Sequence, residues 1–149
     1  MNATSASEHR LQDSPAISVR NLSMRFGAFD AVSNLSFDVG HGEIFGFIGP
    51  NGAGKTTTIR VLSTLLEPTS GSVLVCGKDT SEEPEEVRRL IGYMPDHAGV
   101  YERITVLEFL EFFAAAANVP KHVTNGVIEL TDIGALAGRM VTSLSKGQS

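Results

Sequence analysis

Residues 49–57 limit what this chain can fold into more than any other stretch of its sequence. They read GPNGAGKTT and fit the pattern G-x-x-x-x-G-K-[ST], whose glycines let backbone N–H groups surround phosphate oxygens. The apolar run 44–48 before them predicts a buried strand, and helical spacing of apolar residues predicts a helix over about 55–66. Strand, loop and helix together aim N–H groups and a positive helix end at one point. The sequence therefore predicts a nucleoside triphosphate site in an α/β fold.

The composition limits the class of protein and the kinds of partner. Hydrophobic residues make up 42% of the 149 residues, enough for a globular core. The net charge is −5 and no basic run occurs, so no nucleic acid partner is expected. No apolar stretch reaches the roughly 18 residues that predict a membrane span. The single cysteine, Cys76, ends the apolar run 73–76 and is interpreted as a small core residue in a reducing compartment.

The N-terminal part predicts a tail followed by a β layer. Residues 1–15 are polar, have no apolar centre and predict a disordered tail rather than a signal peptide. Alternation of apolar and polar residues over 17–26 and 35–39 predicts two strands of an antiparallel β layer beside the phosphate-loop strand. The alternation slips by one residue at Asn21, which predicts a β-bulge there. His41 is interpreted as a solvated turn residue.

Shorter elements follow the phosphate loop. Strands are predicted at 72–76 and 91–94, between turn residues. Residues 82–86 open a short acidic helix, in which Glu85 is expected to pair with Arg89 four residues later.

The chain then becomes helical. Residues 105–108 read TVLE, a capping box, and the helix that they open is expected to end at Pro120. A weaker helix is predicted over 123–133, with Val127 and Leu130 on its apolar face.

Four features, in order along the chain, resemble the ATP-binding subunit of an ABC transporter, and the resemblance runs from about Ile17 to the last residue. Phe26 stands where the family has an aromatic residue that stacks on adenine, and 49–57 match its phosphate loop. The stretch YMPD at 93–96 resembles its Q-loop, and LSKGQ at 144–148 resembles its LSGGQ signature. The resemblance implies a P-loop NTPase core with an antiparallel β layer and a helical subdomain.

The resemblance also implies domain bounds and a branch of the family. Residues 16–96 would form the β layer and P-loop core, and 97–149 the helical subdomain. Three threonines at 56–58 and GYMP at 92–95 resemble the exporter-like branch, in which the membrane subunits are separate chains.

For the phosphate loop, the resemblance implies ATP and Mg²⁺ as ligands. Lys55 would contact the β- and γ-phosphates, Thr56 would bind Mg²⁺, and Thr57 would reach the α-phosphate. An alternative for Phe26 is a core position, because it continues the alternation of Met24. The nucleotide-binding residues expected in this part of the chain are Phe26, Gly49, Pro50, Asn51, Gly52, Ala53, Gly54, Lys55, Thr56 and Thr57.

The signature residues Ser145, Gly147 and Gln148 would serve a second nucleotide. In the family, two such domains face head to tail, and each signature closes over the γ-phosphate of the partner. Ser145 is a natural N-cap for a helix that would point at that phosphate. The implied partners are a second ATP-binding domain and a membrane-spanning permease subunit, with this chain on the cytoplasmic face of the membrane.

Two residues depart from the family pattern. Asp96 occupies the place where most members have Gln. Its carboxylate can bind Mg²⁺ and orient water, so Asp96 is predicted as a metal ligand with Thr56 and as a catalytic residue with Lys55 and Thr56. The alternative is that Asp96 only caps the turn after Pro95. Lys146 replaces a glycine of the signature, and little effect is expected from it.

A third departure is the lack of any acidic residue between Arg139 and Ser149. In the family, an Asp-Glu pair and a His follow the signature; the Asp supports Mg²⁺ and the Glu polarises the attacking water. The chain therefore resembles the N-terminal half to two thirds of such a subunit. It is expected to bind nucleotide poorly, to hydrolyse it hardly at all, and to be aggregation-prone through an exposed sheet edge and unmatched helix faces.

The expected function is to couple ATP binding and hydrolysis to transport, in the direction of export, through separate membrane subunits. One alternative is a fragment that binds ATP without hydrolysing it. Another is an ABC-type ATPase without a membrane partner. A small-molecule kinase with the same loop is disfavoured by the signature and by the β layer.

Overall fold

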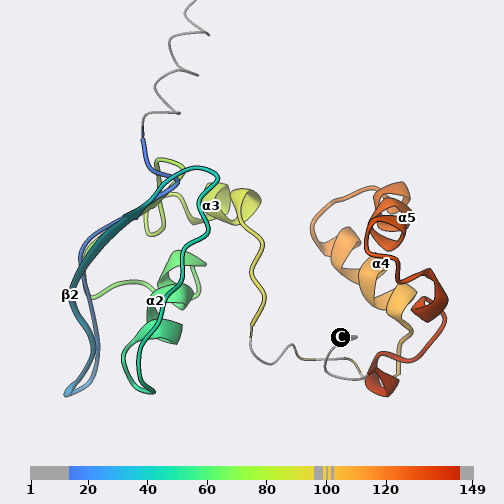
Figure 1. The fold of residues 1–149 in the computed structure, drawn as a ribbon, viewed down its shortest axis with the longest axis horizontal. Coiled ribbons are helices and arrows are strands. Elements are labelled where there is room, and N and C mark those ends of the chain that lie inside the picture. The colour runs from blue at the N-terminus through green and yellow to red at the C-terminus, as the bar shows by residue number, and fades with distance from the viewer. Residues whose placement is uncertain (1–13, 96–98, 100, 102, 145–149) are drawn as a thin grey trace, which may run out of the picture. The chain divides into compact units, whose positions relative to one another are not determined.

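The computed structural model describes residues 14–95, 99, 101 and 103–144, and the chain divides into two compact units, Met1–Tyr93 and Met94–Ser149 (Figure 1). In the described residues no helix is long and apolar enough to cross a membrane.

The first unit is built on a four-stranded antiparallel sheet with the strand order β2-β1-β3-β4. Its strands are β1 (Ile17–Phe26), β2 (Phe29–Val39), β3 (Ser70–Val75) and β4 (Lys78–Asp79). The predicted β layer is therefore confirmed, and its second strand begins earlier than the pattern of apolar residues indicates.

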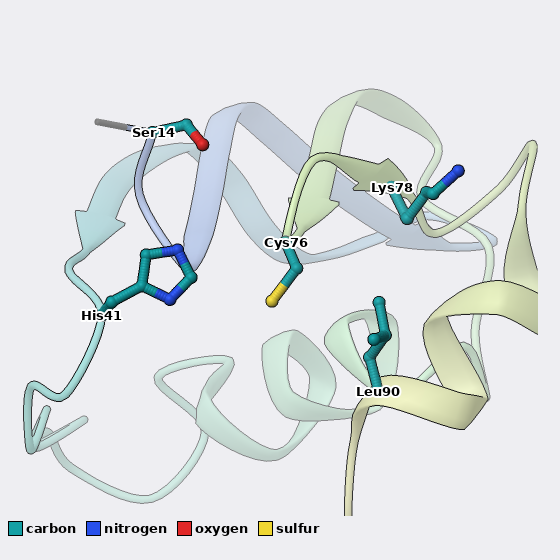
Figure 2. Close-up of a pocket in the computed structure, with 5 residues that line it drawn as sticks. All are labelled: Ser14, His41, Cys76, Lys78 and Leu90. Atoms are coloured by element: carbon teal, nitrogen blue, oxygen red, sulfur yellow. The ribbon is translucent and has the colours of Figure 1, made fainter. Parts of the chain in front are cut away.

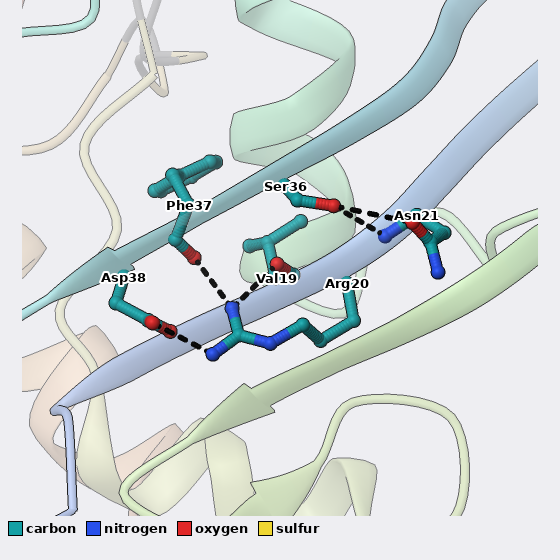
Figure 3. Close-up of polar contacts among 6 residues, drawn as sticks. All are labelled: Val19, Arg20, Asn21, Ser36, Phe37 and Asp38. Carbon is teal, nitrogen blue, oxygen red and sulfur yellow. Dashed lines mark hydrogen bonds and ion pairs between the residues drawn. The ribbon is translucent and has the colours of Figure 1, made fainter.

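The predicted bulge at Asn21 is confirmed. The register between β1 and β2 shifts between Val19 and Leu22, and Asn21 has a φ of 50°. Its N–H donates to the Ser36 hydroxyl at 2.8 Å, a side-chain bond in place of a ladder bond (Figure 3). Gly71 on β3 faces this bulge with a φ of 93°, and a Cβ there would lie 2.5 Å from the Asn21 carbonyl oxygen. Only glycine fits at that position.

An ion pair joins the same two strands on the exposed side. The Arg20 guanidinium donates to the Asp38 carboxylate at 2.6 Å (Figure 3). This hydrogen bond lowers the pKa of Asp38 below its usual value.

Helix α2 (Lys55–Leu62) covers one face of the sheet. Its Val61 is buried with the sheet residues Val19, Leu22, Met24, Val32 and Val73, and this cluster is the core of the unit. The helix ends four residues before the predicted Leu66. Ser63 donates its hydroxyl to the Ile59 carbonyl at 2.8 Å, and Thr64 has a φ of 60°, which a helix cannot continue through.

Helix α3 (Pro84–Leu90) forms as predicted, but its ion pairs differ from the prediction. Glu85 pairs with Arg88 at 2.8 Å and Glu86 pairs with Arg89 at 2.7 Å, so the predicted pair of Glu85 with Arg89 is wrong. Residues three and four apart are both neighbours on a helix surface, and the i,i+3 partners are the ones used here.

The strand predicted at 44–48 is not formed. The segment carries no ladder hydrogen bonds to the described residues, and two of its side chains hold it against β2 instead. Phe45 and Phe47 lie on Phe37, with ring centroids 5.2 and 5.7 Å away. Ile44 and Ile48 are 100% and 96% exposed. A strand needs a neighbour for its backbone N–H and C=O groups, and no described residue provides one.

The prediction of a strand at 91–94 is also wrong. Residues 91–95 have no regular structure, and Met94 is almost fully exposed. The reason is the same, because no described residue pairs with this segment.

The second unit contains α4 (Val106–Ala116), α5 (Lys121–Leu130) and two 3₁₀ turns, Gly134–Leu136 and Val141–Ser143. The predicted capping box is confirmed: the Thr105 hydroxyl accepts from the Glu108 N–H at 3.3 Å, and the Thr105 N–H donates to the Glu108 carboxylate at 2.7 Å. The N–H of Val106 bonds to the Arg139 carbonyl at 2.9 Å, which ties the start of α4 to the later turns.

The apolar face predicted for α5 is wrong. Val127 and Leu130 are exposed, whereas Thr124 is buried and Ile128, one turn later, is half-buried. The helix begins at Lys121 and ends at Leu130, so its packed face is set by this pair rather than by the two predicted residues.

Candidate nucleotide-binding site

The phosphate loop forms a tight turn directly before α2. The N–H of Ala53 bonds to the Pro50 carbonyl at 3.2 Å, and Gly52 and Gly54 have φ values of 84° and 79°. These left-handed conformations need glycine, because a Cβ would clash with the backbone carbonyl oxygen. The helix begins at Lys55, immediately after the second of them.

The two glycines differ in what surrounds them. A Cβ on Gly54 would lie 2.5 Å from the Ala31 carbonyl oxygen and 2.8 Å from a methyl group of Val32, so this glycine rests directly on β2. A Cβ on Gly52 would have no atom within 4 Å. Gly54 therefore anchors the loop on the sheet, and Gly52 leaves open space above it.

The start of α2 is prepared for an anion. The first N–H groups of a helix have no acceptor within the helix, and here these belong to Lys55, Thr56 and Thr57. No side chain caps this end, and the first turn contains no acidic residue. The positive end of the helix dipole is therefore not neutralised by the residues of the helix itself.

Lys55 curls back over the loop. Its ammonium donates to the Gly49 carbonyl at 2.7 Å and to the Pro50 carbonyl at 2.6 Å. An ammonium has three donors, so these two bonds hold the charge at the mouth of the loop and leave a third donor for a ligand. A phosphate at the helix end would lie beside this charge.

The three threonines after the lysine have different roles. Thr58 is buried and donates its hydroxyl to the Gly54 carbonyl at 3.0 Å, so it supports the turn. Thr56 is exposed and Thr57 is half-buried. A hydroxyl and phosphate oxygens are the hard ligands that Mg²⁺ takes, so Thr56 can hold this ion together with a bound nucleotide. Among the described residues, no group of three or more His, Cys, Asp or Glu could hold a metal.

Two aromatic rings lie at the tip of the β1–β2 hairpin. Phe26 is 47% exposed, so the alternative that placed it in the core is wrong. Phe29 pairs with it across the strands and is 62% exposed. Phe29 is not among the residues predicted from the sequence, although its place three residues after Phe26, across a Gly-containing turn, could have indicated it. Because Gly54 touches Ala31, the hairpin tip and the phosphate loop lie in the same part of the unit.

Four predicted site residues, Asp96, Ser145, Gly147 and Gln148, lie outside the described residues, as does Lys146. The other predicted site residues, Phe26 and 49–57, are described and lie in the first unit. Their roles in nucleotide binding stay a prediction.

A separate cavity of about 310 Å³ lies elsewhere in the first unit, lined by Ser14, His41, Cys76, Lys78 and Leu90 (Figure 2).

Cys76 is half-exposed in the turn after β3, with a φ of 48°, so its predicted core position is wrong. The reason is that β3 ends at Val75, one residue earlier than predicted. His41 is an exposed turn residue, as predicted.

Comparison with known proteins agrees with this geometry. A family model described as ABC transporter matches residues 32–149. The chain is 41% identical, over 71% of its length, to the probable multidrug ABC transporter ATP-binding protein YbhF of Escherichia coli. It is 31% identical, over 89% of its length, to the sulfate/thiosulfate import ATP-binding protein CysA of Thermosynechococcus vestitus.

A solved structure titled as the ATP binding subunit of an ABC transporter is also similar. Its TM-score is 0.76, with 29% identity over 89% of the chain. The chain spans 19% and 40% of the two relatives and 57% of the solved chain.

Proposed function

The chain belongs to the ABC transporter family, and from this premise we propose that its loop 49–57 binds the phosphates of MgATP to drive transport. The observation that carries the proposal is the uncapped start of α2, with the Lys55 ammonium held over the loop by two carbonyls. A polyphosphate fits this arrangement, because it brings several negative charges to N–H donors and a cation.

Each residue of the loop takes a distinct part in binding. The backbone N–H groups of Gly52–Thr57 would surround the phosphates, and the open space above Gly52 supports a close approach. Lys55 would exchange its bonds with loop carbonyls for the β- and γ-phosphates. Thr56 would complete the Mg²⁺ shell, and Thr57 would contact the α-phosphate.

The partners of the whole protein are part of the proposal. A second ATP-binding domain would face this one head to tail, with Ser145, Gly147 and Gln148 over the nucleotide of the partner. A membrane-spanning permease subunit would hold both domains at the cytoplasmic face of the membrane. We propose export as the direction, supported by the threonines at 56–58; one relative is named for multidrug transport and another for import, so names alone do not decide it.

Hydrolysis needs a group that orients the attacking water. We propose Asp96 for Mg²⁺ and water contact, in the position of the family's Gln. The described first turn of α2 contributes no carboxylate to the loop. For the 149 residues as a polypeptide on their own, the proposal is therefore ATP binding with little turnover.

The test is calorimetric titration with MgATP of the chain and of Lys55→Ala. Loss of a charged hydrogen-bond donor should weaken binding by about 10- to 100-fold. Lys121→Ala is the matched control, because Lys121 is exposed on α5 and pairs only loosely with Glu111 at 3.3 Å; its affinity should equal that of the wild type.

Equal affinity of Lys55→Ala and wild type would refute the site. The same proteins are assayed for phosphate release, where wild type and Lys55→Ala should not differ. Clear turnover by the wild type alone would show that the 149 residues contain a catalytic base.

A further inference from the structure

The tip of the β1–β2 hairpin carries two exposed aromatic side chains, of which the proposed function uses one. Phe26 ends β1 and Phe29 begins β2, and the two are direct partners across the antiparallel pair. Among the described residues, neither ring stacks on another aromatic side chain. Both rings are therefore available to stack on a ligand, Phe26 being 47% and Phe29 62% exposed.

Both rings belong to the face of the sheet that α2 covers. Phe26 lies two residues after Met24, which is buried in the core beneath α2, so the two share a face. Residues directly opposite in an antiparallel pair point to the same side, which places Phe29 on that face too. The register shift between Met24 and Arg25 keeps Val32 on it as well.

The same face leads directly to the phosphate loop. Ala31, whose carbonyl oxygen meets Gly54, follows Phe29 by two residues, or about 7 Å along a strand. A nucleotide with its phosphates at the start of α2 therefore has both rings within reach of its base.

The hairpin tip is held in place from its other face. Arg25 and Asp30, the next pair in the register, form a two-point ion pair: the Arg25 Nε donates to one carboxylate oxygen and its Nη2 donates to the other at 3.2 Å. Gly27, with a φ of 59°, makes the tight turn between the strands. The backbone that carries the two rings is thus held before a ligand arrives, which reduces the entropy lost on binding.

We propose that Phe29 is a second nucleobase-binding residue, which contacts the base together with Phe26. This inference rests on the proposed function, because it requires a nucleotide at loop 49–57. The interaction is stacking of a π-face on a ring, which is strongest for the large purine bases and needs no hydrogen bond from the protein.

The first experiment distinguishes contacts to the base from contacts to the phosphates. MgATP and inorganic tripolyphosphate with Mg²⁺ are titrated into the wild type, Phe29→Ala and the control Phe112→Ala. Phe112 is a phenylalanine of α4 in the other unit and is 50% exposed, against 62% for Phe29. Phe29→Ala should weaken ATP binding about tenfold and leave tripolyphosphate binding unchanged. Phe112→Ala should change neither.

The second experiment uses the absence of tryptophan from the sequence. Phe29→Trp retains an aromatic face and introduces a single tryptophan at the proposed contact, which is excited separately from the two tyrosines. ATP should quench its emission and tripolyphosphate should not, and ATP affinity should match the wild type. Phe112→Trp should give no quenching with either ligand.

The outcomes distinguish the two levels of the proposal. If neither ligand binds the wild type, the proposed function fails and the role of Phe29 fails with it. If both ligands bind the wild type and Phe29→Ala equally, or ATP leaves the emission of Phe29→Trp unchanged, only the role of Phe29 is overturned.

Discussion

Strand β1 and the segment 44–48 both carry the sequence pattern of a strand, and only β1 is one. β1 pairs with β2 on one side and with β3 on the other, and its Leu22 is fully buried. The segment 44–48 has the aromatic packing of Phe45 and Phe47 on one face, and its other face is open.

The difference shows that an apolar sequence pattern indicates which side chains of a segment avoid water. It does not indicate which strand or helix packs against them. A paired strand satisfies its backbone groups in a ladder, whereas the segment 44–48 leaves them to solvent. The phosphate loop tolerates this because its anchor is elsewhere: Gly54 rests on β2, and α2 packs in the core through Val61.

A methyl group added where β3 packs against β1, and another added within 44–48, should give the largest difference in stability. Gly71→Ala should destabilise the chain by about 4 kcal/mol or more, because the added Cβ meets backbone oxygens of Arg20 and Asn21 at 2.6 and 2.5 Å. Gly46→Ala meets only the end of Ile48 at 3.8 Å and should lie within about 1 kcal/mol of the wild type. Urea unfolding at pH 7 measures both; equal effects would mean that the two regions are equally ordered.

Truncation of an apolar side chain in each region gives the next largest difference. Leu22→Ala removes a fully buried side chain and should cost about 3 kcal/mol. Ile48→Ala removes an exposed one and should change the free energy of unfolding by less than about 0.5 kcal/mol. Thermal and urea unfolding provide the values. A cost above about 2 kcal/mol for Ile48→Ala would place this residue in a core that the structure does not show.

Acidification should change the free energy of unfolding less than either pair of substitutions. Hydrogen bonds from Arg25, Arg20 and Lys78 lower the pKa values of Asp30, Asp38 and Glu83, and the backbone N–H of Thr105 lowers that of Glu108. A carboxyl whose pKa is lower in the folded state stabilises the fold above its unfolded value and loses that contribution as the pH falls through its folded value. Stability should therefore decline below about pH 4.5.

Urea midpoints between pH 7 and pH 3 test the acid prediction, with Asp30→Asn and Asp38→Asn as variants that should flatten the decline. A midpoint that rises as the pH falls would contradict the direction of these shifts.

Much of the site could be predicted from the sequence because its determinants are local. The glycines of 49–57, the lysine and the helix that follows lie within one short stretch, and the capping box at 105–108 needs only its own residues. The alternation over 17–26 also predicted the bulge at Asn21.

The remaining features depend on residues far apart in the chain. The strand at 44–48 needs a neighbour that its own pattern cannot reveal. Thr124 is buried on α5 although Val127 is more apolar, because packing against the rest of its unit selects the face. Phe29 stands three residues after Phe26 in the sequence, and the hairpin register makes the two residues direct partners.

The most direct test of the central claim, a nucleotide at the phosphate loop, is a series of amide ¹H–¹⁵N spectra of the chain with increasing MgATP. If the phosphates bind at the start of α2, the largest shifts should fall on the backbone N–H groups of Gly52–Thr57, with smaller ones at Phe26 and Phe29. Unchanged loop signals, with the main shifts instead around Cys76 and His41 at the separate cavity, would contradict it.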